Sequence, residues 1–130
     1  MIKYSNSYIL HKVDEILEAV VKLLIAGSRG IKEYGLDEHM PKGVTMIITG
    51  GADGIDALAE KYADEKRLSK LILRPQYELY GRGAPLKRNE KMVEICDMAL
   101  IIWDKKSKGT EHTIKYADKL GKEVILVTLE

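Results

Sequence analysis

Residues 44–56 read VTMIITGGADGID, and this segment decides the fold. The apolar run 44–49 is typical of a buried strand, and the glycines that follow permit a tight turn with close backbone approach. From Ile55 to Ala63, apolar residues recur with the period of a helix. The segment therefore predicts a strand that passes through a glycine-rich loop into an amphipathic helix.

Similar units occur on both sides of this segment. Further apolar strands are predicted over residues 21–26, 70–75, 98–103 and 122–129, with helices over 86–96 and up to Gly121 and one helical turn near Leu36–Met40. Near-continuous apolar strands that alternate with helices are typical of a parallel sheet covered on both faces. We therefore predict an α/β fold, a doubly wound, mainly parallel five-stranded sheet in a three-layer α/β/α arrangement. Its strand order is either 2-1-3-4-5 or 3-2-1-4-5.

The chain has 130 residues, which is enough for one domain. We assign residues 21–130 to that domain and residues 1–20 to an N-terminal helical extension, because apolar side chains from Leu10 to Val20 share one helix face. The segment between the first two strands is short, so we expect one face of the sheet to lack a full helix there. The extension or a partner subunit would cover this gap, and we expect a homodimer or a higher homo-oligomer.

The composition excludes several classes of protein. Cys96 is the only cysteine, so a disulfide framework within one chain and a cysteine-based zinc site are ruled out. The three histidines are far apart in the sequence, and we expect no metal site and no cofactor. No apolar window is long enough to span a bilayer, and the first residues lack the pattern of a signal peptide. We therefore expect a cytoplasmic protein without a membrane partner.

Charge is distributed unevenly along the chain. A net charge of +1 gives no overall field that would hold nucleic acid, so we expect that nucleic acid is not a partner. The strand-to-helix loops, however, meet at the carboxyl edge of a parallel sheet. There, residues 27–35 and 104–111 each contribute +1, residues 74–89 contribute +3, and Asp53 and Asp56 subtract two. The resulting +3 predicts a site for an anionic ligand at this edge.

Two of these loops lead into helix starts, where unpaired N–H groups favour anions. The loop Gly50–Asp56 is neither a dinucleotide fingerprint nor a P-loop, and it is interpreted either as an anion site or as a tight turn with Asp53 as the helix N-cap. In the loop 107–110, Thr110 is interpreted as the N-cap, with Glu111 in the first helical turn. Alternatively, Ser107, Thr110 and the backbone of Gly109 hold a second phosphate or a ribose.

The other two loops carry arginines and aromatic residues. Arg29, in Gly27-Ser-Arg-Gly30, is either solvated or a buried arginine that faces an anion, since guanidinium matches phosphate in a bidentate manner. The third loop and the helix start after it contain aromatic, cationic and amide side chains: Tyr77, Tyr80, Arg82, Lys87, Arg88 and Asn89. Either the tyrosines stack on a base and the cations contact phosphate, or these residues form an ordinary surface. Asp56 would accept ribose hydroxyls, act as an acid or base, or stabilise its helix. Trp103 belongs either to the core or to the pocket wall.

The four loops also carry a resemblance. Gly27-Ser-Arg29, Gly50-Gly-Ala-Asp-Gly-Ile-Asp56, Tyr80-Gly-Arg-Gly-Ala-Pro85 with Lys87-Arg-Asn89, and Trp103-Asp-Lys-Lys-Ser-Lys-Gly-Thr110 occur in one order. Over residues 21–128 the chain resembles the YspA/YpsA-related branch of the SLOG superfamily, which groups the DNA-processing protein DprA (Smf) with the LOG phosphoribohydrolases. This resemblance implies a Rossmann-like fold and a pocket for a nucleotide-derived ligand. The residues implied to line it are Gly27, Ser28, Arg29, Gly50, Gly51, Asp53, Gly54, Asp56, Arg88, Asn89, Ser107, Gly109 and Thr110.

We add Ala52 and Arg82 to this set because they lie in the same loops. One departure concerns the LOG pattern PGGxGTxxE, whose Glu is catalytic, because Thr113 stands at the corresponding position and Glu111 is displaced. We predict a protein that binds a nucleotide-derived molecule bearing phosphate or ribose at the carboxyl edge of its sheet. The alternatives are a nucleotide hydrolase, with Asp56 or Glu111 as acid or base, and a DprA-like nucleic-acid-binding module.

Overall fold

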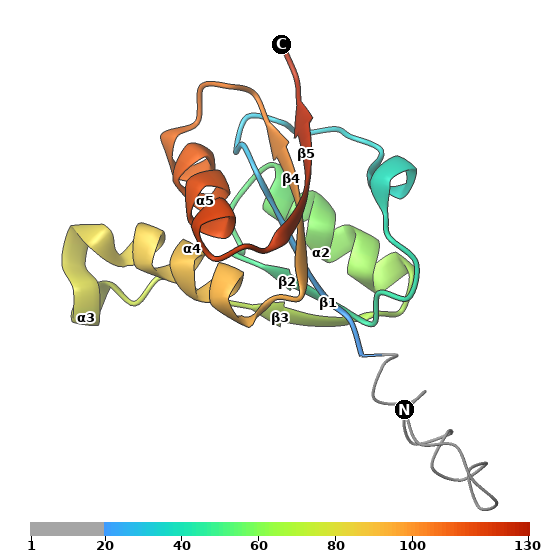
Figure 1. Cartoon of the computed structure of the whole chain (residues 1–130), viewed down its shortest axis with the longest axis horizontal. Helices are drawn as coiled ribbons and strands as arrows, with labels where there is room; N and C mark the ends of the chain where they lie inside the picture. Colours follow the sequence, from blue (N-terminus) through green and yellow to red (C-terminus); the bar gives the residue numbers. More distant parts are fainter. Residues whose placement is uncertain (1–19) are drawn as a thin grey trace, which may run out of the picture.

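A computed structural model describes residues 20–130 and shows a single parallel sheet (Figure 1). The strands are β1 (Lys22–Gly27), β2 (Met46–Thr49), β3 (Ser69–Ile72), β4 (Met98–Trp103) and β5 (Glu123–Thr128). Their order in the sheet is β3-β2-β1-β4-β5, and every neighbouring pair is parallel. The predicted five-stranded α/β fold is confirmed, with the second of the two expected strand orders. The predicted N-terminal helix lies in residues 1–19, outside the described part of the chain.

Helices cover both faces of the sheet. The elements are α2 (Ile55–Glu65), α3 (Tyr77–Tyr80), α4 (Ala84–Ile95), α5 (Lys108–Lys119) and the 3₁₀ turns η1 (Leu36–His39) and η2 (Gly81–Gly83). Figure 1 shows α2 on one face and α4 with α5 on the other, which is the predicted three-layer arrangement. The short helix α3 was not predicted, because its four residues are too few for a helical period to show in the sequence.

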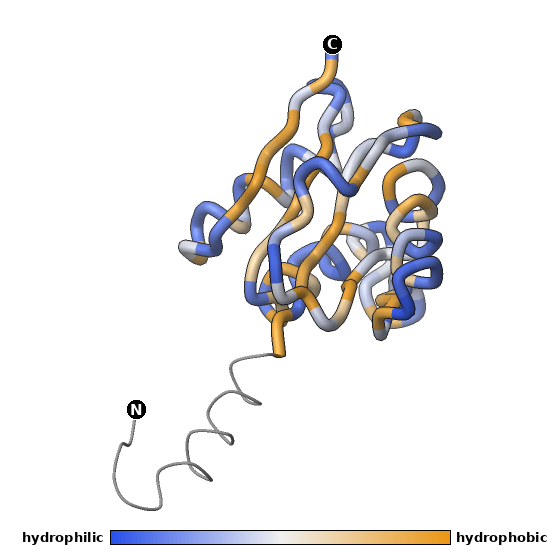
Figure 2. Tube along the Cα trace, turned by 90° about the vertical axis from the view of Figure 1, so that its right-hand side faces the viewer, coloured by the Kyte–Doolittle hydropathy of each residue, from blue (hydrophilic) through white to orange (hydrophobic). Residues whose placement is uncertain are grey.

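The core is divided by the sheet into two apolar clusters. Side chains alternate along β1, so Leu23 and Ile25 pack on the α2 side, whereas Leu24 and Ala26 pack on the side of α4 and α5. Figure 2 shows the resulting apolar strands at the centre of the domain, with hydrophilic segments outside them. Because strands buried on both faces are apolar throughout, the pattern of the sequence was sufficient to predict this sheet.

The connection between β1 and β2 contains only η1 as a helical element. Leu36 is buried there, and Ile31, Tyr34 and Met40 pack against the cluster on the α2 side. Irregular chain therefore covers part of the sheet face where a full helix was expected to be absent. Throughout residues 20–130, no helix is both long and apolar enough to cross a membrane.

Candidate functional site

A pocket of about 440 Å³ lies at the carboxyl edge of the sheet. Its walls come from the loops after β1, β2 and β4, from α4 and from the start of α5. The predicted convergence of these three loops is confirmed, whereas residues 73–83 after β3 do not line this pocket. It brings together nine of the fifteen predicted ligand-binding residues, namely Gly27, Arg29, Ala52, Asp56, Arg88, Asn89, Ser107, Gly109 and Thr110. Whether they bind a ligand stays a prediction.

Gly54 lets the first two loops pack against each other. Gly54 has a φ of +74°, and a Cβ there would stand 2.5 Å from the backbone oxygen of Ser28. The N–H of Ile55 donates to that same oxygen at 3.4 Å, which ties the start of α2 to the loop after β1. Gly54 is the N-cap residue and Asp53 is exposed, so the interpretation of Asp53 as N-cap is wrong. Only glycine fits because of its φ and the close carbonyl.

Arg88 forms the floor of the pocket and is only 8% exposed. Its Nη1 donates to the carbonyl oxygens of Gly50 at 2.5 Å and Leu73 at 3.1 Å, while Nε donates to Asn89 at 2.8 Å. Among the described residues, Nη2 has no acceptor, and no buried side-chain nitrogen or oxygen lacks a partner. Nη2 is therefore accessible to solvent, and it can donate to an anionic oxygen.

Asp56 is the buried carboxylate of the site, with 7% of its surface exposed. Its Oδ2 accepts the N–H of Ala52 at 3.1 Å. Burial raises the pKa of Asp56, and the Ala52 hydrogen bond and the charges of Arg88 and Arg29 lower it by less. The carboxylate thus offsets part of the positive charge at the pocket floor.

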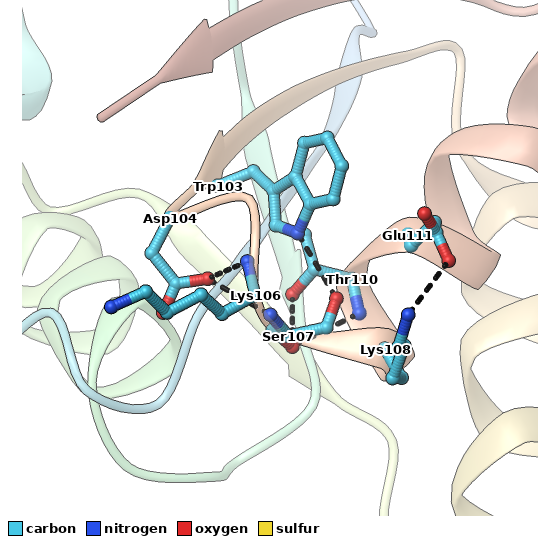
Figure 3. Close-up of polar contacts among 7 residues, drawn as sticks. All are labelled: Trp103, Asp104, Lys106, Ser107, Lys108, Thr110 and Glu111. Carbon is cyan, nitrogen blue, oxygen red and sulfur yellow. Dashed lines mark hydrogen bonds and ion pairs between the residues drawn. The ribbon is translucent and has the colours of Figure 1, made fainter. Parts of the chain in front are cut away.

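The loop between β4 and α5 is built by its own hydrogen bonds (Figure 3). Asp104 Oδ1 accepts the N–H groups of Lys106 at 2.8 Å and Ser107 at 2.9 Å, and these bonds, Ser107 first, lower the pKa of Asp104. Ser107 is the N-cap of α5, because its Oγ accepts the N–H of Thr110 at 3.2 Å. The expectation that Thr110 is the N-cap is therefore wrong by three residues. The Thr110 hydroxyl instead lies 2.9 Å from Ser107 Oγ.

Ser28 and Trp103 hold this loop in place by hydrogen bonds without lining the pocket. Ser28 is fully buried, and its Oγ accepts the N–H of Asp104 at 3.0 Å, which joins the loops after β1 and β4. Trp103 Nε1 donates to the carbonyl of Ser107 at 3.0 Å (Figure 3). Trp103 therefore stabilises the loop through its hydrogen bond and is not part of the pocket wall.

Arg29 and Lys106 are the accessible cations of the pocket. Both are exposed, so the alternative in which Arg29 is a buried loop arginine is wrong. Neither forms an ion pair or a side-chain hydrogen bond with any residue in the range 20–130. Gly109 lies near Asn89, in the first turn of α5, where N–H groups have no acceptor within the helix. The pocket therefore offers cationic and backbone donors to one anion.

Six predicted residues do not line the pocket: Ser28, Gly50, Gly51, Asp53, Gly54 and Arg82. A Cβ at Gly50 would stand 2.7 Å from Arg88 Nη1, so this glycine makes room for the arginine. Arg82 lies in η2, which precedes α4, and only residues of α4 itself extend to the pocket. Glu111 also lies outside and pairs with Lys108 at 4.0 Å (Figure 3). Asp56 and Glu111 as acid or base stay predictions.

Sequence reasoning left out several residues that line the pocket, among them Met92, Asp104, Lys106 and Thr113. Met92 follows Arg88 by four positions on α4, and Thr113 follows Thr110 by three on α5. Residues at these spacings share a helix face, so helical periodicity was the signal that could have identified Met92 and Thr113. Within the described residues, no three His, Cys, Asp or Glu side chains form a group that could hold a metal.

Comparison with known proteins gives one finding on the fold. No protein-family model matches the chain, and no curated protein matches its sequence. The structure is similar to that of DNA processing protein A from Helicobacter pylori, with a TM-score of 0.63 and 20% sequence identity. The match covers 89% of this chain and 69% of the other, which is described for a unique single-stranded DNA binding mode. At this identity, the similarity establishes the Rossmann-like fold.

This comparison corrects the expectation that nucleic acid is not a partner. The expectation relied on a net charge of +1, yet a protein of this fold is described as binding single-stranded DNA. The physical reason is that contacts with phosphate depend on where cations lie, and here the acidic residues lie mostly elsewhere on the chain. Total charge was the wrong quantity for judging this class of partner.

Proposed function

We propose that this domain binds single-stranded nucleic acid, with one nucleotide phosphate held in the pocket at the carboxyl edge of the sheet. The observation that carries the proposal is the group of cationic donors around this pocket. Arg29 and Lys106 are accessible and unpaired among the described residues, and the Arg88 side chain also lines the pocket. The fold shared with a protein described as binding single-stranded DNA supports it.

The pocket suits a phosphate bonded to a flexible chain. It is open to solvent and combines a planar guanidinium with backbone N–H groups at a helix start. Phosphate contacts of this kind hold a strand without reading its sequence. We therefore expect affinity for single strands, with little dependence on sequence and a strong dependence on salt.

Binding of a fluorescein-labelled dT20 oligonucleotide, followed by fluorescence anisotropy, tests this function. We expect Arg29→Gln to weaken binding about tenfold and to lower the slope of log K against log salt by about 0.7, the value for one phosphate contact on a single strand. Lys115→Gln is the matched control, because it removes the same charge from an exposed position on α5 outside the pocket. No binding of dT20 at 50 mM salt, or equal losses in both variants, would contradict the proposal.

The pH dependence of binding follows from Asp56. Because burial raises its pKa, the carboxylate becomes neutral on acidification at a higher pH than an ordinary aspartate does. Above that pKa the charged carboxylate repels phosphate, so dT20 affinity should rise as the pH falls through the raised pKa. Asp56→Asn should bind a few-fold more tightly at pH 8 and lose this dependence. A parallel pH profile for both proteins would contradict this role of Asp56.

A free nucleotide-derived molecule is the second candidate ligand. It is favoured by the size of the pocket, since about 440 Å³ lies within the usual range for small-molecule sites. Competition of dTMP and ADP-ribose against labelled dT20 separates the two candidates. A small molecule that displaces dT20 at a concentration well below the Kd of the oligonucleotide would favour the small-molecule function.

The four motifs in order support assignment to the YspA/YpsA-related branch, which we infer from the sequence alone.

A further inference from the structure

A second hollow, of about 580 Å³, lies beside the pocket on the outer side of α4. It is lined by the loop after β3, by α3 and by α4, and Arg88 lines both hollows. The sequence offered Tyr80 and Lys87 as contacts for a base and for phosphate, but neither lines the first pocket, and Lys91 was not among the candidates. We propose that this hollow is a subsite for the next nucleotide of a single strand whose phosphate occupies the first pocket. This inference rests on the proposed function and extends it to a second nucleotide.

Two arginines bind the carbonyl oxygens of the glycine loop at the boundary between the two hollows. Arg88 Nη1 donates to the carbonyl of Gly50, and Arg74 Nη1 donates to the carbonyl of Gly51 at 3.1 Å. Gly51 has a φ of +71°, and a Cβ there would contact the Arg74 guanidinium. Arg74 lines only the second hollow, whereas Ala52, the next residue in the loop, lines only the first. A chain that passes over this short loop would therefore meet cations on both sides.

The acidic residues of the second hollow are engaged with α5. Glu90 Oε2 lies 2.9 Å from His112 Nε2, and Glu94 Oε2 accepts the hydroxyl of Tyr116 at 2.7 Å. The second hydrogen bond raises the pKa of Tyr116 to about 12. These contacts hold one oxygen of each carboxylate toward α5, on the inner side of α4. Since four cationic side chains and only these two carboxylates line the hollow, its net charge is positive.

The cations of the hollow, by contrast, are largely accessible. Lys91 is exposed and forms no ion pair with a residue in the described range. Lys87 is also exposed, and its Nζ lies 3.8 Å from Glu90, a weak pairing across one helical turn. Arg74 has its position fixed by Gly51 and remains exposed. Together they provide the point charges and the guanidinium that phosphate contacts require.

Tyr80 supplies a surface for a base. It ends α3, lines the second hollow, and is 46% exposed. In Figure 1, α3 lies at the outer end of α4, away from the sheet. Stacking of a base on an aromatic ring tolerates any sequence and is typical of single-strand binding. Tyr77 is also exposed but does not line this hollow, so it provides a matched control.

The test compares dTMP with the dinucleotide pTpT as competitors of labelled dT20. We expect pTpT to compete about tenfold better than dTMP with the wild-type protein. Lys91→Gln and Tyr80→Leu should each reduce this advantage about fivefold and leave dTMP unchanged, whereas Tyr80→Phe should retain it because the ring remains. Lys115→Gln and Tyr77→Leu should behave like the wild-type protein.

The outcomes separate the subsite from the proposed function. If dT20 binds and depends on Arg29, but Lys91→Gln and Tyr80→Leu match their controls, the subsite is overturned and the function stands. If dT20 does not bind the wild-type protein, both are overturned. If dTMP also weakens in Lys91→Gln, the hollow acts through the first pocket, and the assignment of a separate second nucleotide is contradicted.

Discussion

Alanine at position 54 is expected to destabilise the domain by about 4 kcal/mol, through backbone strain and overpacking together. Gly54 has a φ of +74° and a ψ of −127°, a conformation that side chains rarely adopt. A Cβ there would also meet the backbone of Ser28 and Arg29, which cannot move without separating the loop after β1 from α2. Urea unfolding followed by circular dichroism measures the free energy of unfolding. Loss of dT20 binding should accompany the loss of stability.

Gly81→Ala separates the two causes. Gly81 has nearly the same backbone conformation, with a φ of +56° and a ψ of −132°, but nothing lies near the position of its Cβ. Strain alone should lower its free energy of unfolding by about 1–2 kcal/mol. If Gly54→Ala is no more destabilising than Gly81→Ala, the close packing of the two loops is contradicted.

Arg88→Ala is expected to destabilise the domain by about 3 kcal/mol, because it removes three hydrogen bonds of a charged donor. The buried carbonyl of Gly50 and the carbonyl of Leu73 would lose this partner, and Asp56 would lose a neighbouring cation. For a domain of this size, the midpoint of thermal unfolding should fall by about 10 °C. Differential scanning calorimetry measures this change.

Arg82→Ala is the control for this substitution. Arg82 is exposed and makes no side-chain hydrogen bond with any other residue of the described chain, so its loss should change the free energy of unfolding by less than about 0.5 kcal/mol. Equal changes in the two variants would show that Arg88 is not a structural residue of the site.

The sequence was sufficient to predict the sheet, because apolar strands alternate with helices and the first two strands end at glycines. It also placed Arg29, Arg88 and Thr110 at one edge, since parallel strands bring their following loops together. It could not distinguish glycines that pack loops from glycines that face a ligand. Gly54 belongs to the first kind only because of its contact with Ser28, which is distant in the sequence.

The caps and the second hollow were harder to predict. Asp53 is a favoured N-cap residue, but Gly54 takes this position because the contact with Ser28 determines where α2 begins. At α5, local hydrogen bonds within the loop make Ser107 the N-cap in place of Thr110. The second hollow depends on α3, which is too short to show a helical period. Its accessible charge depends on the hydrogen bonds between α4 and α5, which a sequence does not display.

The most direct test of the central claim is an NMR titration of the ¹⁵N-labelled protein with unlabelled dT20. If the strand lies at the carboxyl edge, the largest changes in amide chemical shift should occur at Gly30, Ala52, Lys106 and Gly109, which line the first pocket. Amides at the opposite edge of the sheet, such as those of Thr45 and Gly121, should not change. Changes concentrated at that opposite edge, or none at saturating oligonucleotide, would contradict the account.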